Sequence, residues 1–174
     1  MNNVFLVKPS IQYEKQYKEM IAAWTAISND LVPWVLKLDC TDFRKFITYL
    51  NNIENGIDLT SRQVKCSTFF LMKDDGIMLG ASNVRHEINK QLYFYGGHIG
   101  YGIRPDHRNA GYATNLLRLS LLEAALLGIK TVRITCEEGN IASERVIAKN
   151  GGVFDTTIID DDKLTKRYWI QTGQ

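Results

Sequence analysis

Residues 97–114 constrain the fold most strongly, because they place a strand directly before a helix with a sharp turn between them. The alternation of apolar residues from Ile99 to Ile103 is typical of a strand, and Pro105 ends it. A helical pattern then begins at about Gly111. The turn between the two elements is therefore short and tight.

The start of this helix is a candidate anion site. A helix N-terminus has several backbone N–H groups without intrahelical partners, and its aligned peptide dipoles add about half a positive charge. Gly111 lets a ligand approach the backbone, Ala113 leaves the next turn unobstructed, and Arg108 could add a side-chain charge. The alternative is an ordinary strand-turn-helix connection whose glycine only relieves crowding.

Two well-known phosphate loops do not fit these residues. A P-loop requires Gly-x-x-x-x-Gly-Lys-Ser/Thr, and no Lys-Ser or Lys-Thr follows a glycine at that spacing. The dinucleotide fingerprint begins at Gly100 and Gly102, but Pro105 stands where its third glycine is needed and has no amide donor. The turn therefore belongs to another class.

The segment Arg108–Ala113 resembles motif A of the GNAT acetyltransferase superfamily, whose pattern is Gln/Arg-x-x-Gly-x-Gly/Ala. The resemblance runs from about Gly97 to Gly152 and more loosely over most of the chain, and it extends to a branch of bacterial acetyltransferases with unassigned acceptors. It implies an α/β fold of the α+β type, with a mixed central sheet of about seven strands and helices on both faces. We expect one domain over residues 1–174.

The resemblance also implies acetyl-coenzyme A as co-substrate, with its diphosphate on the amides of residues 108–113 and its pantetheine arm along residues 101–103. The implied cofactor-binding residues are Tyr101, Gly102, Ile103, Arg108, Asn109, Ala110, Gly111, Tyr112, Ala113, Asn140 and Ser143. Asn140 matches an asparagine that contacts the cofactor in many members, but it is an equally good helix N-cap.

Acetylation of an amine requires a base, because an amine with a pKa near 10.4 is neutral in only about one molecule in a thousand at pH 7. His98 is the first candidate, since many members carry a glutamate at this strand position and histidine accepts a proton near neutral pH. The alternative is a buried, hydrogen-bonded core histidine. His86 with Glu87, and Glu137 with Glu138, are further candidates.

The acid that protonates the leaving thiolate is less evident. Many members place a tyrosine seven residues after the asparagine, where this chain has Ile147. Ser143, a water or Tyr168 could replace it, or the thiolate could leave unaided. A covalent route through Cys136 has little support, because this residue alternates with core positions and has no motif partner.

The implied function is an N-acetyltransferase that moves acetyl to a primary amine of an unidentified acceptor, small molecule or peptide, by direct transfer with both substrates bound. The alternatives are a non-catalytic acyl-CoA-binding or sensing module, or another phosphate-containing ligand in the same turn. Five aromatic residues could line a cleft for an alkyl ammonium or belong to the core: Trp24, Trp34, Tyr93, Tyr95 and Tyr101. The acidic triplet 160–162 could attract a basic acceptor or be a solvated turn.

The charge and hydropathy of the sequence limit the kinds of partner that we expect. The 21 basic and 19 acidic residues give a net charge of +2 and no sign of a nucleic-acid surface. No window approaches the roughly 18 apolar residues of a membrane span, so we expect no membrane partner and a cytoplasmic location. Cys40, Cys66 and Cys136 are far apart, which predicts neither disulfides nor a metal site. A homodimer is compatible with the resemblance.

Apolar periodicity predicts the remaining elements. The expected strands are 2–8, 64–72, 77–87, 92–95 continuing at 98–103, 129–136 as a parallel strand, 153–159 and 166–170. The expected helices are 13–27, 41–51 with Thr41 as N-cap, 112–127 and 140–150.

Overall fold

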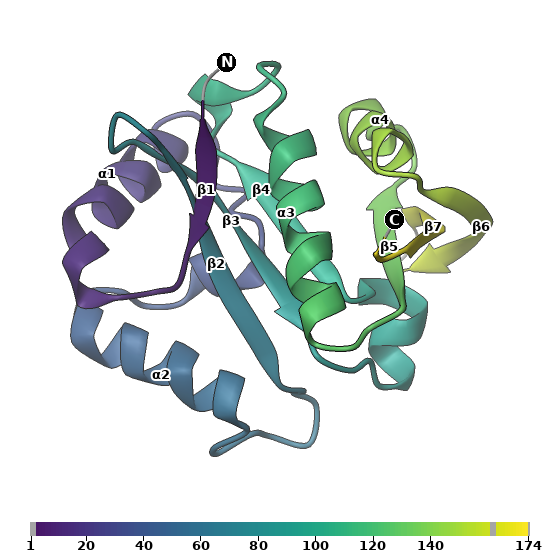
Figure 1. Cartoon of the computed structure of the whole chain (residues 1–174), viewed down its shortest axis with the longest axis horizontal. Coiled ribbons are helices and arrows are strands. Elements are labelled where there is room, and N and C mark those ends of the chain that lie inside the picture. Colours follow the sequence, from purple (N-terminus) through teal and green to yellow (C-terminus); the bar gives the residue numbers. More distant parts are fainter. Residues whose placement is uncertain (1–2, 161–162, 174) are drawn as a thin grey trace.

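The computed structural model describes residues 3–160 and 163–173, which form two sheets with helices packed on them (Figure 1). The strands are β1 Val4–Val7, β2 Cys66–Lys73, β3 Met78–Arg85, β4 Ile99–Ile103, β5 Thr131–Glu137, β6 Val153–Asp160 and β7 Lys163–Gln171. The longer helices are α1 Glu14–Thr25, α2 Phe43–Asn55, α3 Tyr112–Leu126 and α4 Ile141–Lys149. Short helices are η1 Ile11–Tyr13, η2 Trp34–Lys37, η3 Leu92–Gly96 and η4 Pro105–His107.

The first sheet has the antiparallel order β1-β2-β3-β4, with α1 and α2 on one face and α3 on the other (Figure 1). Strand β2 is buried on both faces, and its successive side chains point to opposite sides. Phe70 and Met72 pack in the cluster beneath α1 and α2, whereas Phe69 and Leu71 pack beneath α3. The sheet is therefore the central layer of this half of the molecule.

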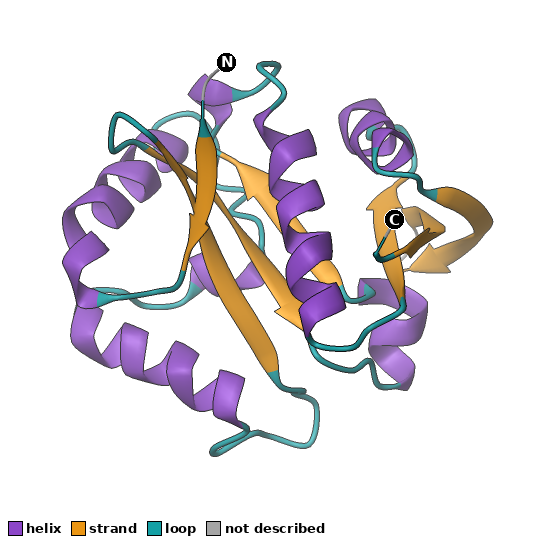
Figure 2. Cartoon of the chain, viewed as in Figure 1, coloured by secondary structure: helices purple, strands orange, loops and turns teal. Residues whose placement is uncertain are grey.

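The second sheet has the antiparallel order β5-β7-β6, and Figure 2 shows the strands in two groups with α3 drawn between them. The α/β class and the seven strands are as expected, but the sheet is divided between β4 and β5. At the division the His98 amide donates to the Arg133 carbonyl over 2.7 Å. Asp161 and Asp162, expected in the β6–β7 turn, lie outside the described residues.

The prediction of a strand at residues 92–95 was wrong, because this segment forms the π-helix η3, the teal helix beside β5 in Figure 1. The Asn89 side chain accepts a hydrogen bond from the Leu92 amide over 3.0 Å, and the Gly97 amide closes the wide turn on the Leu92 carbonyl over 2.6 Å. The aromatic rings of the helix then pack against the second sheet, a tertiary contact that overrides local strand preference.

Helix α2 begins one residue later than expected. Asp42 is its N-cap and accepts from the Lys45 amide over 3.1 Å, whereas the Thr41 hydroxyl donates to Asp39. Gly56, with a φ of 76°, ends the helix after Asn55. The prediction of Thr41 as the cap was therefore wrong, because the Asp42 carboxylate caps the helix one residue later and the Thr41 amide and hydroxyl both bond to Asp39.

Three further findings concern the described part of the chain. None of its helices is long and apolar enough to cross a membrane. It contains no group of three or more His, Cys, Asp or Glu side chains that could hold a metal ion. The thiols of Cys40, Cys66 and Cys136 are free.

Candidate functional site

The turn before α3 presents backbone amides to solvent. Gly111 is the N-cap of α3 with a φ of 80°, and Asn109 also has a positive φ of 63°. Among the described residues, the amides of Asn109, Ala110, Gly111 and Ala113 donate to no backbone carbonyl. A Cβ on Gly111 would meet nothing within 4 Å, so the space before these amides is open. The arrangement suits an anion.

Arg108 stands beside this turn. Its Nε donates to the Ile103 carbonyl over 3.0 Å, and its guanidinium carbon lies 5.7 Å from the centre of the Trp24 ring. These two contacts hold an otherwise exposed positive charge at the end of β4. The charge therefore adds to the field of the helix N-terminus.

Strands β4 and β5 are each an edge strand, so their unpaired edges face the gap between the two sheets. Tyr101 and Ser143 meet in this region, with 3.1 Å between their hydroxyl oxygens. Burial raises the pKa of Tyr101 to about 12, and the hydrogen bond between Tyr101 and Ser143 opposes this shift only in part. The Asn140 side chain accepts from the Ser143 amide over 3.0 Å, so Asn140 acts as an N-cap here and its contact with a ligand stays a prediction.

Gly102 is closed on the side where a side chain would stand. A Cβ there would lie 2.3 Å from the Val32 carbonyl oxygen and 2.9 Å from the Trp24 ring. Gly100 similarly faces Pro33, at 3.3 Å. The loop before η2 thus covers this face of β4, and the backbone edge remains the part of Gly102 and Ile103 that a ligand can reach.

His98 is buried where the two sheets meet, with 8% of its surface exposed. Its Nδ1 accepts from the Arg133 amide over 2.9 Å, so the neutral ring carries its proton on Nε2. Burial lowers the pKa of His98 below its ordinary 6.5, which keeps the ring neutral at pH 7. His98 can take up a proton at Nδ1 only by releasing the Arg133 amide.

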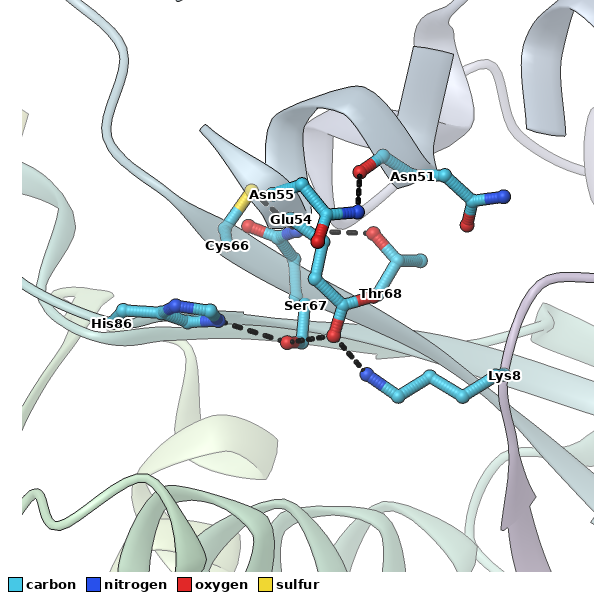
Figure 3. A network of polar contacts seen from close by, with 9 residues as sticks. Lys8, Asn51, Glu54, Asn55, Cys66, Ser67, Thr68 and His86 are labelled. Carbon is cyan, nitrogen blue, oxygen red and sulfur yellow. Dashed lines mark hydrogen bonds and ion pairs between the residues drawn. The ribbon is translucent and has the colours of Figure 1, made fainter. Parts of the chain in front are cut away.

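His86 belongs to a separate polar network beside α2 (Figure 3). The Ser67 hydroxyl donates to Glu54 over 2.6 Å, and its oxygen lies 2.9 Å from His86 Nε2, which must therefore be the donor. Lys8 also pairs with Glu54. Burial opposes ionisation of Glu54, but the bonds from Lys8 and Ser67 outweigh it and lower its pKa. The proton on His86 Nε2 is thus committed to this network.

The surroundings of the other candidate residues do not favour a catalytic role. Glu137 forms an exposed pair with Lys163 at 2.8 Å. Burial raises the pKa of the Cys136 thiol to about 11, which disfavours a thiolate nucleophile, and the Tyr168 hydroxyl bonds to that thiol. Ile147, at the position of the superfamily tyrosine, is fully buried in the core beneath α3.

Trp34 and Tyr95, two of the aromatics expected in a cleft, line a cavity of about 380 Å³ beside η3, and sequence reasoning missed the two arginines beside them, Arg62 and Arg85. Its lining residues come from five separate segments, and the one local signal for the arginines is Arg85 at the end of an otherwise buried strand. A larger cavity of about 900 Å³ lies between α3 and β7, and none of the predicted site residues lines it.

Comparison with known proteins identifies the family. The sequence model of one protein family, described as acetyltransferase (GNAT) domain, matches residues 9–153. A search of curated proteins finds no match.

Three solved structures share the fold. The acetyltransferase from Salmonella typhimurium that modifies the N-terminal serine of ribosomal protein L7/L12 is 13% identical with a TM-score of 0.70, over 99% of this chain and 97% of that one. RimL, a ribosomal L7/L12 alpha-N-protein acetyltransferase in complex with coenzyme A, is 13% identical with a TM-score of 0.71, over 99% and 96%. A spermidine N-acetyltransferase SpeG mutant from Vibrio cholerae is 14% identical with a TM-score of 0.66, over 97% and 93%.

Proposed function

This chain belongs to the GNAT acetyltransferase family, and from that premise we propose that it transfers an acetyl group from acetyl-coenzyme A to a primary amine, with both substrates bound together. The observation that carries the proposal is the open turn before α3, where several amides and Gly111 face solvent. Such a turn fits a diphosphate, which is the part of the carrier that a helix N-terminus binds best.

The unpaired edge of β4 supports the same assignment. Backbone groups at Gly102 and Ile103 lie on an edge strand that no strand of the described chain covers on that side. An extended amide-containing arm can add to such an edge as a further strand. We therefore assign the arm of acetyl-coenzyme A to the gap between β4 and β5, and its diphosphate to the amides of residues 108–113.

Acetyl-coenzyme A supplies a thioester when it is bound. Transfer forms one N–C bond, breaks one C–S bond and moves a proton from the amine nitrogen to sulfur. We assign the proton on sulfur to the Ser143 hydroxyl, which Tyr101 supports from β4 at 3.1 Å. His98 is the base that we assign to the amine, acting at Nδ1 in exchange for the Arg133 amide.

A thiol-release assay with acetyl-coenzyme A and a panel of neutral, cationic and anionic amines tests the proposal. We expect thiol release that depends on the amine. Tight binding of acetyl-coenzyme A without such release, for every amine, would instead assign the chain to a non-catalytic acyl-CoA-binding module, a reading that Ile147 favours.

Two variants test the acid. Ser143→Ala and Tyr101→Phe should each lower kcat by about tenfold to a hundredfold, because the proton donor or its support is lost, while affinity for coenzyme A changes by less than about threefold. Tyr49→Phe is the control, since it removes a more exposed hydroxyl on α2. Unchanged kcat in both test variants would remove the pair from the mechanism.

A further inference from the structure

The cavity beside η3 carries positive charge without a matching acid. The described residues that line it include Arg62 and Arg85 and no carboxylate. Neither arginine forms an ion pair with a carboxylate in the described parts of the chain. Because a half-buried charge without a counterion is costly, this arrangement favours an anionic ligand.

Arg85 is held in an orientation that suits such a ligand. Its Nη1 donates to the carbonyls of Gly96 and Gly97, over 3.2 and 2.9 Å. Its Nε and Nη2 have no hydrogen-bond partner among the described residues, and they are not sealed in the core. A guanidinium fixed on one side and open on the other is ready to bind a carboxylate with paired N–H groups.

The rest of the cavity suits a small organic molecule. Trp34, Ile53 and Leu92 supply apolar wall, and the volume of about 380 Å³ lies in the range of small-ligand sites. A polyamine, by contrast, would bring further positive charge toward the two arginines. The charge of the lining therefore separates acceptor classes that size alone does not.

The cavity lies at the end of β4 opposite the turn proposed for the diphosphate. Gly96 lines it, and Gly97 and His98 lead directly into β4. The turn proposed for the diphosphate lies beyond Ile103, at the opposite end of this 5-residue strand. At about 3.3 Å per residue the strand separates the two sites by roughly 13 Å. Donor and acceptor thus approach β4 from its two ends.

We propose that this cavity binds the acidic end of the acceptor, so that the acceptor is a small amine that also carries a carboxylate. The proposal rests on the acetyltransferase function proposed above. Arg85 and Arg62 bind the carboxylate, and the amine extends toward His98.

The test compares acceptors that differ in one group. A series of ω-amino carboxylates from glycine to aminohexanoate is assayed for thiol release beside the matching carboxamides, which keep the amine and lose the charge. The best carboxylate should exceed its carboxamide in kcat/KM by about tenfold to a hundredfold, the size expected for one charge-assisted contact.

The matched variants are Arg62→Glu and Arg44→Glu. Both arginines are exposed and both changes reverse one charge, but Arg44 lies on α2 outside the cavity lining. Arg62→Glu should abolish the preference for carboxylates, and Arg44→Glu should preserve it. Thiol release that is equal or faster with carboxamides or diamines, or a preference that survives Arg62→Glu, would overturn the inference and leave the acetyltransferase function standing.

Calorimetry with the same carboxylates gives a readout that does not depend on turnover. Binding that Arg62→Glu weakens, in a chain that releases no thiol with any amine, would support the cavity and refute the enzyme assignment. Absence of binding to wild type at millimolar concentrations would refute the cavity.

Discussion

Replacing Gly111 with alanine tests whether this glycine serves anion binding or only the conformation of the turn. Gly111 has φ 80° and ψ −2°, a left-handed conformation that costs a residue with a Cβ about 1–2 kcal/mol. For a chain of this length, 1 kcal/mol corresponds to about 2–4 °C in Tm. Gly111→Ala should therefore lower Tm by roughly 2–8 °C. No clash adds to this cost, because the new methyl group meets nothing within 4 Å.

Gly128 provides the matched control at the other end of α3. It has the same φ of 80°, and a Cβ there also meets nothing within 4 Å. Gly128→Ala should therefore lower Tm by a similar amount. Only Gly111→Ala places a methyl group where the diphosphate must approach the amides, so it alone should weaken coenzyme A binding, by about tenfold to a hundredfold. Gly111→Glu adds a negative charge there and should abolish binding.

The assay is calorimetric titration of coenzyme A into both variants, beside thermal unfolding of each. Equal affinity in Gly111→Ala and wild type, with the same loss of Tm as Gly128→Ala, would refute the reasoning, because the glycine would then serve only the turn. Equally weakened binding in both variants would assign the effect to stability instead.

Further predictions concern the junction of the sheets and the buried arginines. His98→Ala should lower kcat by about two to four orders of magnitude. His98→Asn should do the same, because asparagine can accept a hydrogen bond from the Arg133 amide but cannot take up a proton. Activity near wild type in His98→Asn would show that the residue only holds β4 against β5. Since burial lowers the pKa of His98, the acid limb of the kcat/KM profile should lie below pH 6.5. Asp155→Asn leaves Arg133 and Arg167, at 2.8 and 3.7 Å, without their carboxylate and should lower stability by about 3 kcal/mol, or roughly 6–12 °C in Tm. Glu137→Gln breaks an exposed pair and should cost less than about 1 kcal/mol, and equal losses in the two variants would contradict this ranking.

The elements around the proposed diphosphate site could be predicted from sequence because their signals are local. A proline ends β4, a glycine with positive φ begins α3, and leucines follow at helical spacing. The contact between Tyr101 and Ser143 could not be predicted from a local pattern, because 42 residues separate them. It results from the strand-helix-strand order, which brings β4 and the start of α4 together.

The errors arose where distant contacts decide the local conformation. Residues 92–95 contain strand-forming aromatics, yet they are helical because Tyr93 and Trp169 enclose the Arg133 guanidinium, each ring centre 4.3 Å from it. In the sequence the one sign of this arrangement is Arg133 between Val132 and Ile134, and its complete burial is known only from the structure. The sequence could suggest Trp34 and Tyr95 as cleft residues, but the two arginines join them only through the packing of η3 and were therefore not predicted.

The helix η3 has two faces with different neighbours, and this has an evolutionary consequence. Leu92, Tyr95 and Gly96 form one wall of the arginine cavity, while Tyr93 on the same short helix is fastened to Arg133. A substitution in the distant second sheet that loosens this fastening would reshape the cavity without touching it. Changes in acceptor preference can thus originate in residues that no acceptor ever meets.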